Sequence, residues 1–421
     1  MEQKSKYEIY YLRRNPFPTK PIAPYYDPEE IAEAINKFCE TARKEELDFI
    51  RNKFIRPAIE EKESTNLWLE GDVGVGKSAL LIKCWDELRK RKNVVAIYAP
   101  IYSGLRSEGF YKGWIRQLGI DFFEDLAYRL LQKAFVEKLD ALLSHLSPDE
   151  QRKVKPKIEN AVKENYKVLR QIFHGPKISE IKELRHIDKN ELLRQFEYWL
   201  ASIPGVTCKR LISSSRSNPA IIPLFLQKPE EAFKSLVDLY PPRYAISVLQ
   251  DIILLSDKAG FDMTFLLLDQ LDFQWERAGW SKAKKDKIIL ELRTLVAEVS
   301  GKLAIATTTY PHLSPVLRGD PDLMSALPMT PERLCLVSRL GKEAIREIFA
   351  TYLHSERTKE DVPELLPFTV DAIDEITSRE MGNTRQILIT AHDILSKAAD
   401  EKVKQINRDY VKSYYEAKRR S

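Results

Sequence analysis

The sequence predicts an α/β fold: a parallel sheet flanked by helices, with a large helical insertion and a small helical region near the C-terminal end. A glycine-rich loop at 71–78 lies between a short apolar strand and a helix. A largely helical stretch, about 101–260, interrupts the strand pattern. Further short apolar runs are typical of buried parallel strands, and they cover 94–99, 265–268, 303–309 and 333–337.

The first 30 residues are rich in aromatic residues and proline, which excludes a regular helix. We expect this segment to be extended and to lie across the domain that follows it. A helical pattern begins at about Pro28, where Asp27 is a plausible N-cap. A second helix is predicted from Leu47 to Ile55. The predicted organisation is an N-terminal segment (1–30), a nucleotide-binding core (31–340) and a helical domain (341–421).

The loop at 71–78 matches G-x-x-x-x-G-K-[ST] at every fixed position. Its glycines let backbone N–H groups surround phosphates, and the following helix adds the positive end of its dipole. Lys77 is expected to reach the β- and γ-phosphates of ATP, and the Ser78 hydroxyl to bind Mg²⁺. The residues expected to hold the nucleotide are Gly71, Asp72, Val73, Gly74, Val75, Gly76, Lys77, Ser78 and Ala79.

The run Phe265–Leu268 ends in Asp269, the pattern of a strand that presents an Asp to Mg²⁺ beside a phosphate loop. Ser78 and Asp269 are therefore the predicted metal ligands. The strand at 303–309 contains Thr308. A helix is expected from about Lys342 to His354, and the stretch 369–417 is helical, with Gly382-Asn383-Thr384-Arg385 at a helix start.

Composition excludes several classes of protein. No apolar run approaches the roughly 18–20 residues that span a bilayer, and the start of the chain shows no secretory signal. The cysteines make no C-x-x-C and the histidines no metal-ligand spacing, so no structural metal is assigned. A cytoplasmic protein with reduced thiols is expected. The net charge of +5 allows a nucleic-acid partner without requiring one.

Over about 15–100 and 260–415, this order of motifs resembles the AAA+ ATPases. Within them it resembles the branch of replication initiators, transposition-regulator ATPases and ATP-binding proteins of phage-exclusion systems. The resemblance implies that Thr308 is the polar residue called sensor 1. It implies that Arg385 is the sensor 2 arginine, which opens a lid helix and points at the γ-phosphate. Asn15-Pro16-Phe17 is similar to the segment that these proteins lay along the adenine pocket.

The chain departs from the family at Gln270, where the resemblance implies a glutamate that polarises the attacking water. An amide cannot take the proton of that water, so ATP should bind and be hydrolysed poorly. The alternatives are a naturally weak ATPase, Asp272 acting instead, or a deliberate Glu-to-Gln change that traps the ATP state. The catalytic set predicted from the resemblance is Asp269, Gln270, Thr308, Arg385 and Arg318.

Arg318 is the first candidate for an arginine finger that reaches the nucleotide of a neighbouring subunit, and Arg339 is the second. A surface arginine is the alternative for both. The resemblance therefore implies a homo-oligomer with ATP at its interfaces. Lys77 and Asp269 are 192 residues apart (269 − 77), so the helical insertion at about 101–260 is the expected place of specific function.

Duplex DNA and a second protein both remain open as the binding partner of this chain. Basic clusters, such as 152–157 and Lys209-Arg210, suit phosphates but equally suit a solvated surface. Only 36 residues follow Arg385 (421 − 385), which disfavours an initiator that continues into a DNA-binding domain. The leading hypothesis is an ATP-dependent oligomeric switch on DNA, of transposition-regulator or phage-defence type. The alternatives are a remodelling or signalling ATPase whose insertion binds a protein, and a metabolic P-loop kinase.

Overall fold

The computed structural model describes residues 5–19, 28–101, 104–175, 181–215, 218–240, 245–271, 282–299 and 301–420. Its centre is a parallel five-stranded sheet in the order β2-β3-β4-β1-β5. The strands are β1 (Asn66–Glu70), β2 (Val94–Pro100), β3 (Met263–Asp269), β4 (Leu303–Thr309) and β5 (Leu334–Leu336). All five lie where the apolar runs predicted them, and the predicted α/β fold class is confirmed.

The central strands are apolar on both faces because protein covers both. On β3, Phe265 and Leu267 pack into one core and Leu266 and Leu268 into the other. The first core is formed with the helices next to the phosphate loop. Those helices are α1 (Pro28–Asn36), α2 (Lys44–Ile50) and α3 (Lys77–Arg89). The predicted second helix continues beyond Ile50 as a π-helical turn, Arg51–Ile55.

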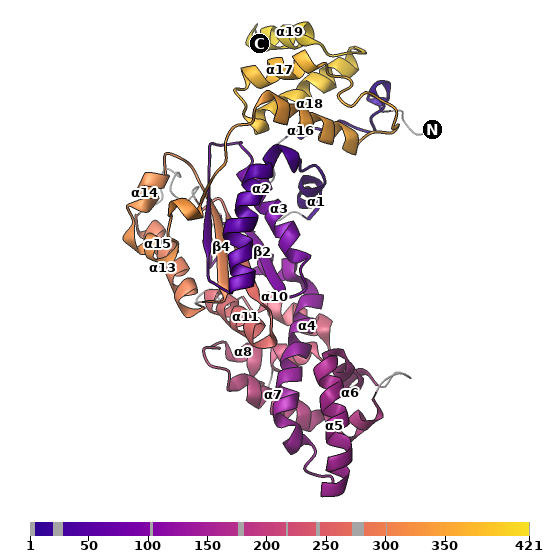
Figure 1. Ribbon diagram of the computed structural model, residues 1–421, viewed down its shortest axis with the longest axis vertical. Helices are drawn as coiled ribbons and strands as arrows, with labels where there is room; N and C mark the ends of the chain where they lie inside the picture. Colours follow the sequence, from indigo (N-terminus) through magenta and orange to yellow (C-terminus); the bar gives the residue numbers. More distant parts are fainter. Residues whose placement is uncertain are drawn as a thin grey trace.

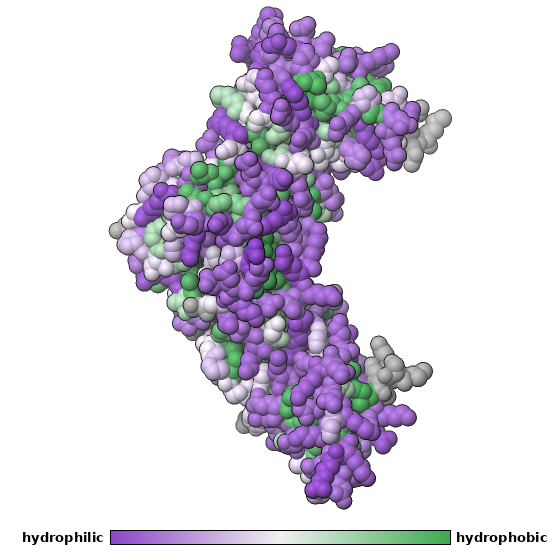
Figure 2. All heavy atoms as spheres, in the orientation of Figure 1, coloured by the Kyte–Doolittle hydropathy of each residue, from purple (hydrophilic) through white to green (hydrophobic). Residues whose placement is uncertain are grey.

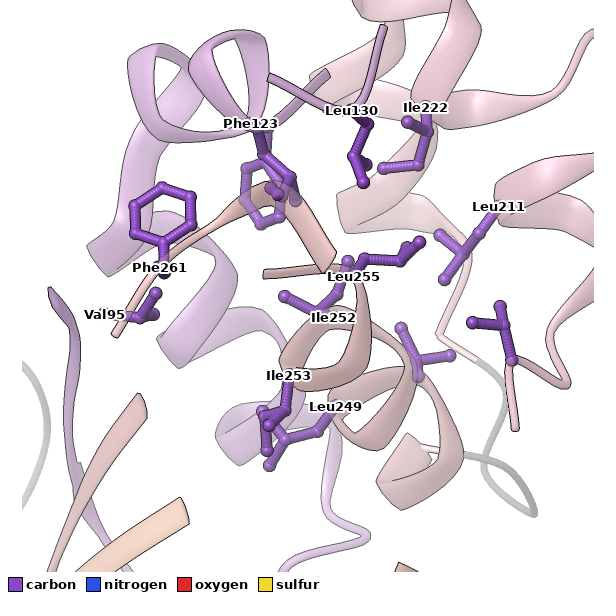
Figure 3. Packing of buried hydrophobic residues seen from close by; sticks show 14 of the residues in the cluster. Val95, Phe123, Leu130, Leu211, Ile222, Leu249, Ile252, Ile253, Leu255 and Phe261 are labelled. Carbon is purple, nitrogen blue, oxygen red and sulfur yellow. The ribbon is translucent and has the colours of Figure 1, made fainter. Parts of the chain in front are cut away.

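The second core continues from the sheet into the insertion without a break. Figure 3 shows side chains from β2, α4, α8, α9 and α11 meeting there. The insertion contains α4 (Glu108–Leu142), α5 (Pro148–Glu164), α6 (Arg170–His174), α7 (Lys189–Ala201), α8 (Lys209–Ile212), α9 (Ile221–Phe225), α10 (Pro229–Asp238) and α11 (Ala245–Ala259). The polar composition of 208–219 predicts a loop there, and this prediction is partly wrong. Lys209–Ile212 is helical because Leu211 and Ile212 are buried.

Among the residues that the structure describes, β3 is followed by α13 (Lys282–Glu298), and β4 by α14 (Ser314–Arg318) and α15 (Pro321–Ala326). The C-terminal helices form a third core at the far end of the molecule from the insertion (Figure 1). These are α16 (Lys342–Ser355), α17 (Val370–Arg379), α18 (Thr384–Asp400) and α19 (Arg408–Arg420), together called the lid below. Within the described part of the chain, no helix has the length and apolar character needed to cross a membrane.

The N-terminal segment packs on the lid, whereas we expected it to lie across the domain that follows it. Tyr10, Leu12 and Phe17 belong to the core of the lid. The phenol of Tyr10 donates to Val403 O at 2.6 Å, and Leu12 forms an antiparallel bridge with Arg357. The physical reason is that the lid, with its four helices, leaves an apolar surface that these aromatic residues cover.

Candidate nucleotide-binding site

A cavity of about 600 Å³ lies between the phosphate loop, the C-terminal ends of β2–β4 and the lid. Its polar end is lined by the loop, Asp269, Gln270 and Thr308. Its other end is lined by side chains of the N-terminal segment, α1, α16 and α18, many of them apolar. These include Pro18, Ala34, Phe38, Ile348, Tyr352, Leu388 and Ile389. A polar end joined to an apolar end suits a nucleotide, with its phosphates and its base respectively.

The loop adopts a backbone that requires glycine at two positions. Gly74 has a φ of 82°, and Gly76, the N-cap of α3, has a φ of 104°. Gly71 is required for a different reason, since a Cβ there would lie 2.4 Å from Val337 O. The sequence motif therefore corresponds to the tight strand–loop–helix turn that it predicted.

Hydrogen-bond donors of the protein occupy the backbone carbonyl groups of the loop. Lys77 Nζ donates to Gly71 O at 2.5 Å and to Asp72 O at 3.2 Å. Asn383 Nδ2 donates to Val73 O at 2.9 Å, and the backbone N–H of Arg385 donates to Gly74 O at 3.1 Å. The buried guanidinium of Arg43 donates to Val75 O. Turning the carbonyl oxygens towards protein donors is what a loop needs in order to offer its N–H groups to an anion.

Lys77 lies at the polar end of the cavity, as the motif predicted. Its ammonium is 4.1 Å from the centroid of the Tyr310 ring and is held by the loop carbonyls described above. Tyr310 directly follows β4 and also lines the cavity. The lysine therefore stays inside the loop, within the same cavity as Ser78 and Asp269.

Asp269 is fully buried at the end of β3, and neighbouring groups hold both of its carboxylate oxygens. Tyr98 donates its phenolic proton to Oδ2 at 2.9 Å, and Thr308 Oγ1 donates to Oδ1 at 3.4 Å. Burial raises the pKa of Asp269, while hydrogen bonds from Ser78 and Tyr98 act to lower it. Thr308 also accepts a hydrogen bond from the backbone N–H of Gln270 at 3.0 Å. The structure thus brings Ser78, Asp269 and Thr308 together.

A carboxylate hydrogen-bonded to the hydroxyl that follows the loop lysine is a donor set that suits Mg²⁺. Ser78 and Asp269 would hold the ion, which would supply positive charge to neutralise the phosphates. No group of three or more His, Cys, Asp or Glu side chains placed to hold a metal occurs among the described residues.

Gln270 lines the cavity next to Asp269 and has a φ of 61°, which places its backbone in the left-handed region. A non-glycine residue in this region is strained and needs support from its surroundings. The hydrogen bond to Thr308 supplies part of that support. Asp272, the alternative water-activating residue, lies outside the described residues.

The lid reaches the cavity through the start of α18. Asn383 is the N-cap of this helix and accepts from Gln386 N, while its amide donates to the loop. Arg385, the second residue of α18, also lines the cavity. A Cβ on Gly74 would lie 2.4 Å from Asn383 Oδ1, so the loop and the lid are in close contact.

The two candidate arginine fingers lie in different surroundings. Arg339 Nε and Nη2 donate to the Asp72 carboxylate at 3.1 and 2.9 Å, and Nη1 donates to Met381 O at 3.2 Å. Arg339 therefore joins the loop to the lid of its own chain. Arg318 is exposed at the end of α14, where its Nε lies 3.3 Å from Met329 Sδ, and it does not line the cavity.

Sequence reasoning missed four residues at this site: Arg43, Tyr98, Tyr310 and the amide of Asn383. Tyr98 is one of many apolar-looking positions in a buried strand, and Arg43 lies in a short 3₁₀ turn outside any motif. Tyr310 carried a weak signal, since it directly follows the strand that ends in Thr308 and Thr309. Asn383 lies within the motif Gly382-Asn383-Thr384-Arg385, in which the predicted site residue was Arg385.

Neither a protein-family model nor a curated protein sequence matches the chain. Among solved structures, the chain is similar to the structure of the Aeropyrum pernix ORC1 protein in complex with DNA. That likeness has a TM-score of 0.40 and 13% sequence identity, and it covers 90% of this chain and 68% of that chain. What the site can do is therefore judged from this chain's own residues.

Proposed function

We propose that this chain is an AAA+ ATPase that binds ATP with Mg²⁺ and acts as an ATP-dependent oligomeric switch on DNA, of transposition-regulator or phage-defence type. The observation that carries the proposal is the single cavity that combines the phosphate loop, Asp269, Thr308 and Arg385 with a helical lid. A metabolic kinase is disfavoured because Thr308 and Arg385 line this cavity beside a helical lid.

In this proposal each residue has a defined task. Lys77 moves from the loop carbonyls to the β- and γ-phosphates, and the loop N–H groups bind the phosphate oxygens. Arg385 offers its charge to the γ-phosphate from the lid. Gln270 orients a water molecule but cannot accept its proton, so hydrolysis is slow. The chain would accordingly rest in its ATP-bound form.

Assembly is proposed to place a neighbour's Arg318 at this cavity. Arg318 is exposed and lies outside the cavity of its own chain, which leaves it available to another subunit. Arg339 is a weaker candidate because it is already bound to Asp72 within the chain. A finger donated in trans makes ATP at one site sensitive to the neighbouring subunit.

The charge of the insertion favours nucleic acid as the binding partner. Residues 101–260 contain 25 basic and 20 acidic residues, so this segment carries +5, equal to the net charge of the whole chain. Several of these cations are paired, as Lys155 is with Asp140 and Lys157 with Glu183. The remaining positive excess would contact the DNA backbone without reading its sequence.

Light scattering, with and without ATP and duplex DNA, tests the proposal. We expect the mass to increase with ATP and the protein to bind duplex DNA, with an affinity that falls steeply as salt rises. Lys77→Ala should lose the response to ATP. Absence of DNA binding at low salt, both with and without ATP, would reject the DNA switch. Assembly that depends on ATP and ignores DNA would favour a remodelling or signalling ATPase whose insertion binds a protein.

A further inference from the structure

A tyrosine on the neighbouring strand holds the metal-binding carboxylate of the proposed site. β2 and β3 are parallel, with Pro100 opposite Asp269, so Tyr98 lies diagonally across from Asp269 on the same face of the sheet. The phenol is 2.9 Å from Asp269 Oδ2, and Tyr98 is 6% exposed. Both side chains line the nucleotide cavity.

The insertion fixes the backbone of this tyrosine. β2 is an edge strand of the sheet, so one side of its backbone needs partners from outside the sheet. Gln117 of α4 supplies an acceptor and a donor for this backbone. Its Oε1 accepts from Tyr98 N at 2.6 Å, and its Nε2 donates to Tyr98 O at 3.0 Å. Tyr98 is therefore held at both ends, by Gln117 at its backbone and by Asp269 at its hydroxyl.

We propose that Tyr98 is a positioning residue for the divalent cation of the nucleotide site, acting through Asp269. The proposal rests on the proposed function. By donating to Oδ2, the phenol fixes the rotamer of the carboxylate and leaves Oδ1 beside Thr308, in the cavity that Ser78 also lines. A partner that orients a metal ligand in this way typically contributes roughly ten- to a hundredfold to metal affinity.

The test compares Tyr98→Phe, which removes one hydroxyl and keeps the ring, with the unmodified chain. ATP affinity is measured by calorimetry in EDTA and again with saturating MgCl₂. The ratio of the two affinities is the gain due to the metal. We expect Tyr98→Phe to reduce this gain by roughly tenfold or more, while the affinity in EDTA stays within about twofold.

Tyr111→Phe is the matched control. Tyr111 is also a buried tyrosine, but its hydroxyl donates to a backbone carbonyl, Leu236 O at 3.0 Å, and it lies in the insertion, outside the cavity. The Tyr111→Phe variant should lower the melting temperature about as much as Tyr98→Phe does. It should leave the gain in ATP affinity due to the metal unchanged. Equal gains in both variants, or an equal loss of affinity in EDTA and in MgCl₂ for Tyr98→Phe, would overturn the inference. An unmodified chain that binds no ATP would instead reject the proposed function.

Discussion

In the proposed function, Gln270 determines what the site can do after ATP has bound. Its amide lies in the cavity next to Asp269, held in a left-handed backbone by the Thr308 hydroxyl. Since glutamine and glutamate have the same shape, a glutamate would occupy this position without repacking. The difference between the two is chemical: only the carboxylate accepts a proton from water.

Gln270→Glu should therefore raise the rate of ATP hydrolysis, by roughly 10²- to 10⁴-fold, the usual contribution of a general base. Phosphate release under saturating ATP measures it. The double variant Lys77→Ala, Gln270→Glu serves as the control and should return to the background rate. If Gln270→Glu alone leaves phosphate release unchanged, another feature limits hydrolysis.

Gly74 is one of the residues at which the loop touches the lid. Gly74→Ala places a side chain in left-handed backbone, which costs about 1–2 kcal/mol, and pushes its Cβ against Asn383 Oδ1. We expect ATP affinity to fall about tenfold or more. Gly113→Ala is the control, because that glycine is helical and has no atom within 4 Å of an added Cβ. An unchanged affinity in Gly74→Ala would contradict the close loop–lid contact.

At the scale of elements, the N-terminal segment belongs to the lid. Phe17 is 3% exposed, and its ring lies 5.0 Å from that of Phe349 and 5.8 Å from that of Tyr352. Backbone bonds join the same elements, since Thr358 N donates to Tyr11 O at 3.0 Å. The apolar end of the cavity thus includes residues from the N-terminal segment and from the lid.

Phe17→Ala should destabilise the lid by about 3–5 kcal/mol, the usual loss for a buried phenylalanine. Hydrogen exchange of α16 and α18 should accelerate, while that of the insertion helices should not. Ile9→Ala, in the same segment but 46% exposed, should change stability by less than about 0.5 kcal/mol. Exchange that accelerates equally in the insertion would contradict the packing of this segment on the lid.

The elements that the sequence predicted best were those with a strong local pattern of residue types. Each apolar run became a strand, and the loop at 71–78 links β1 and α3 with the expected glycine geometry. What was not predicted depends on contacts between distant residues. The position of the N-terminal segment depends on the lid surface some 340 residues later, as in Thr358 N to Tyr11 O. The hydrogen bond from Tyr98 to Asp269 depends on the order of the strands in the sheet, which local periodicity does not encode.

On the scale of the whole molecule, the nucleotide cavity lies where the sheet meets the lid, and the insertion extends to the opposite end (Figure 1). Figure 2 shows one side of the molecule hollowed between the lid and the far end of the insertion. The continuous core from the sheet into α4 and α11 makes the insertion an extension of the sheet domain. The sheet and the insertion therefore form one packed body.

Calorimetric titration of the chain with ATP and MgCl₂ tests the central claim, that this cavity is an ATP–Mg²⁺ site, most directly. We predict saturable binding of one ATP per chain, which Lys77→Ala abolishes and Arg385→Ala weakens. Binding that Lys77→Ala leaves unchanged, or no binding in the unmodified chain, would contradict the account.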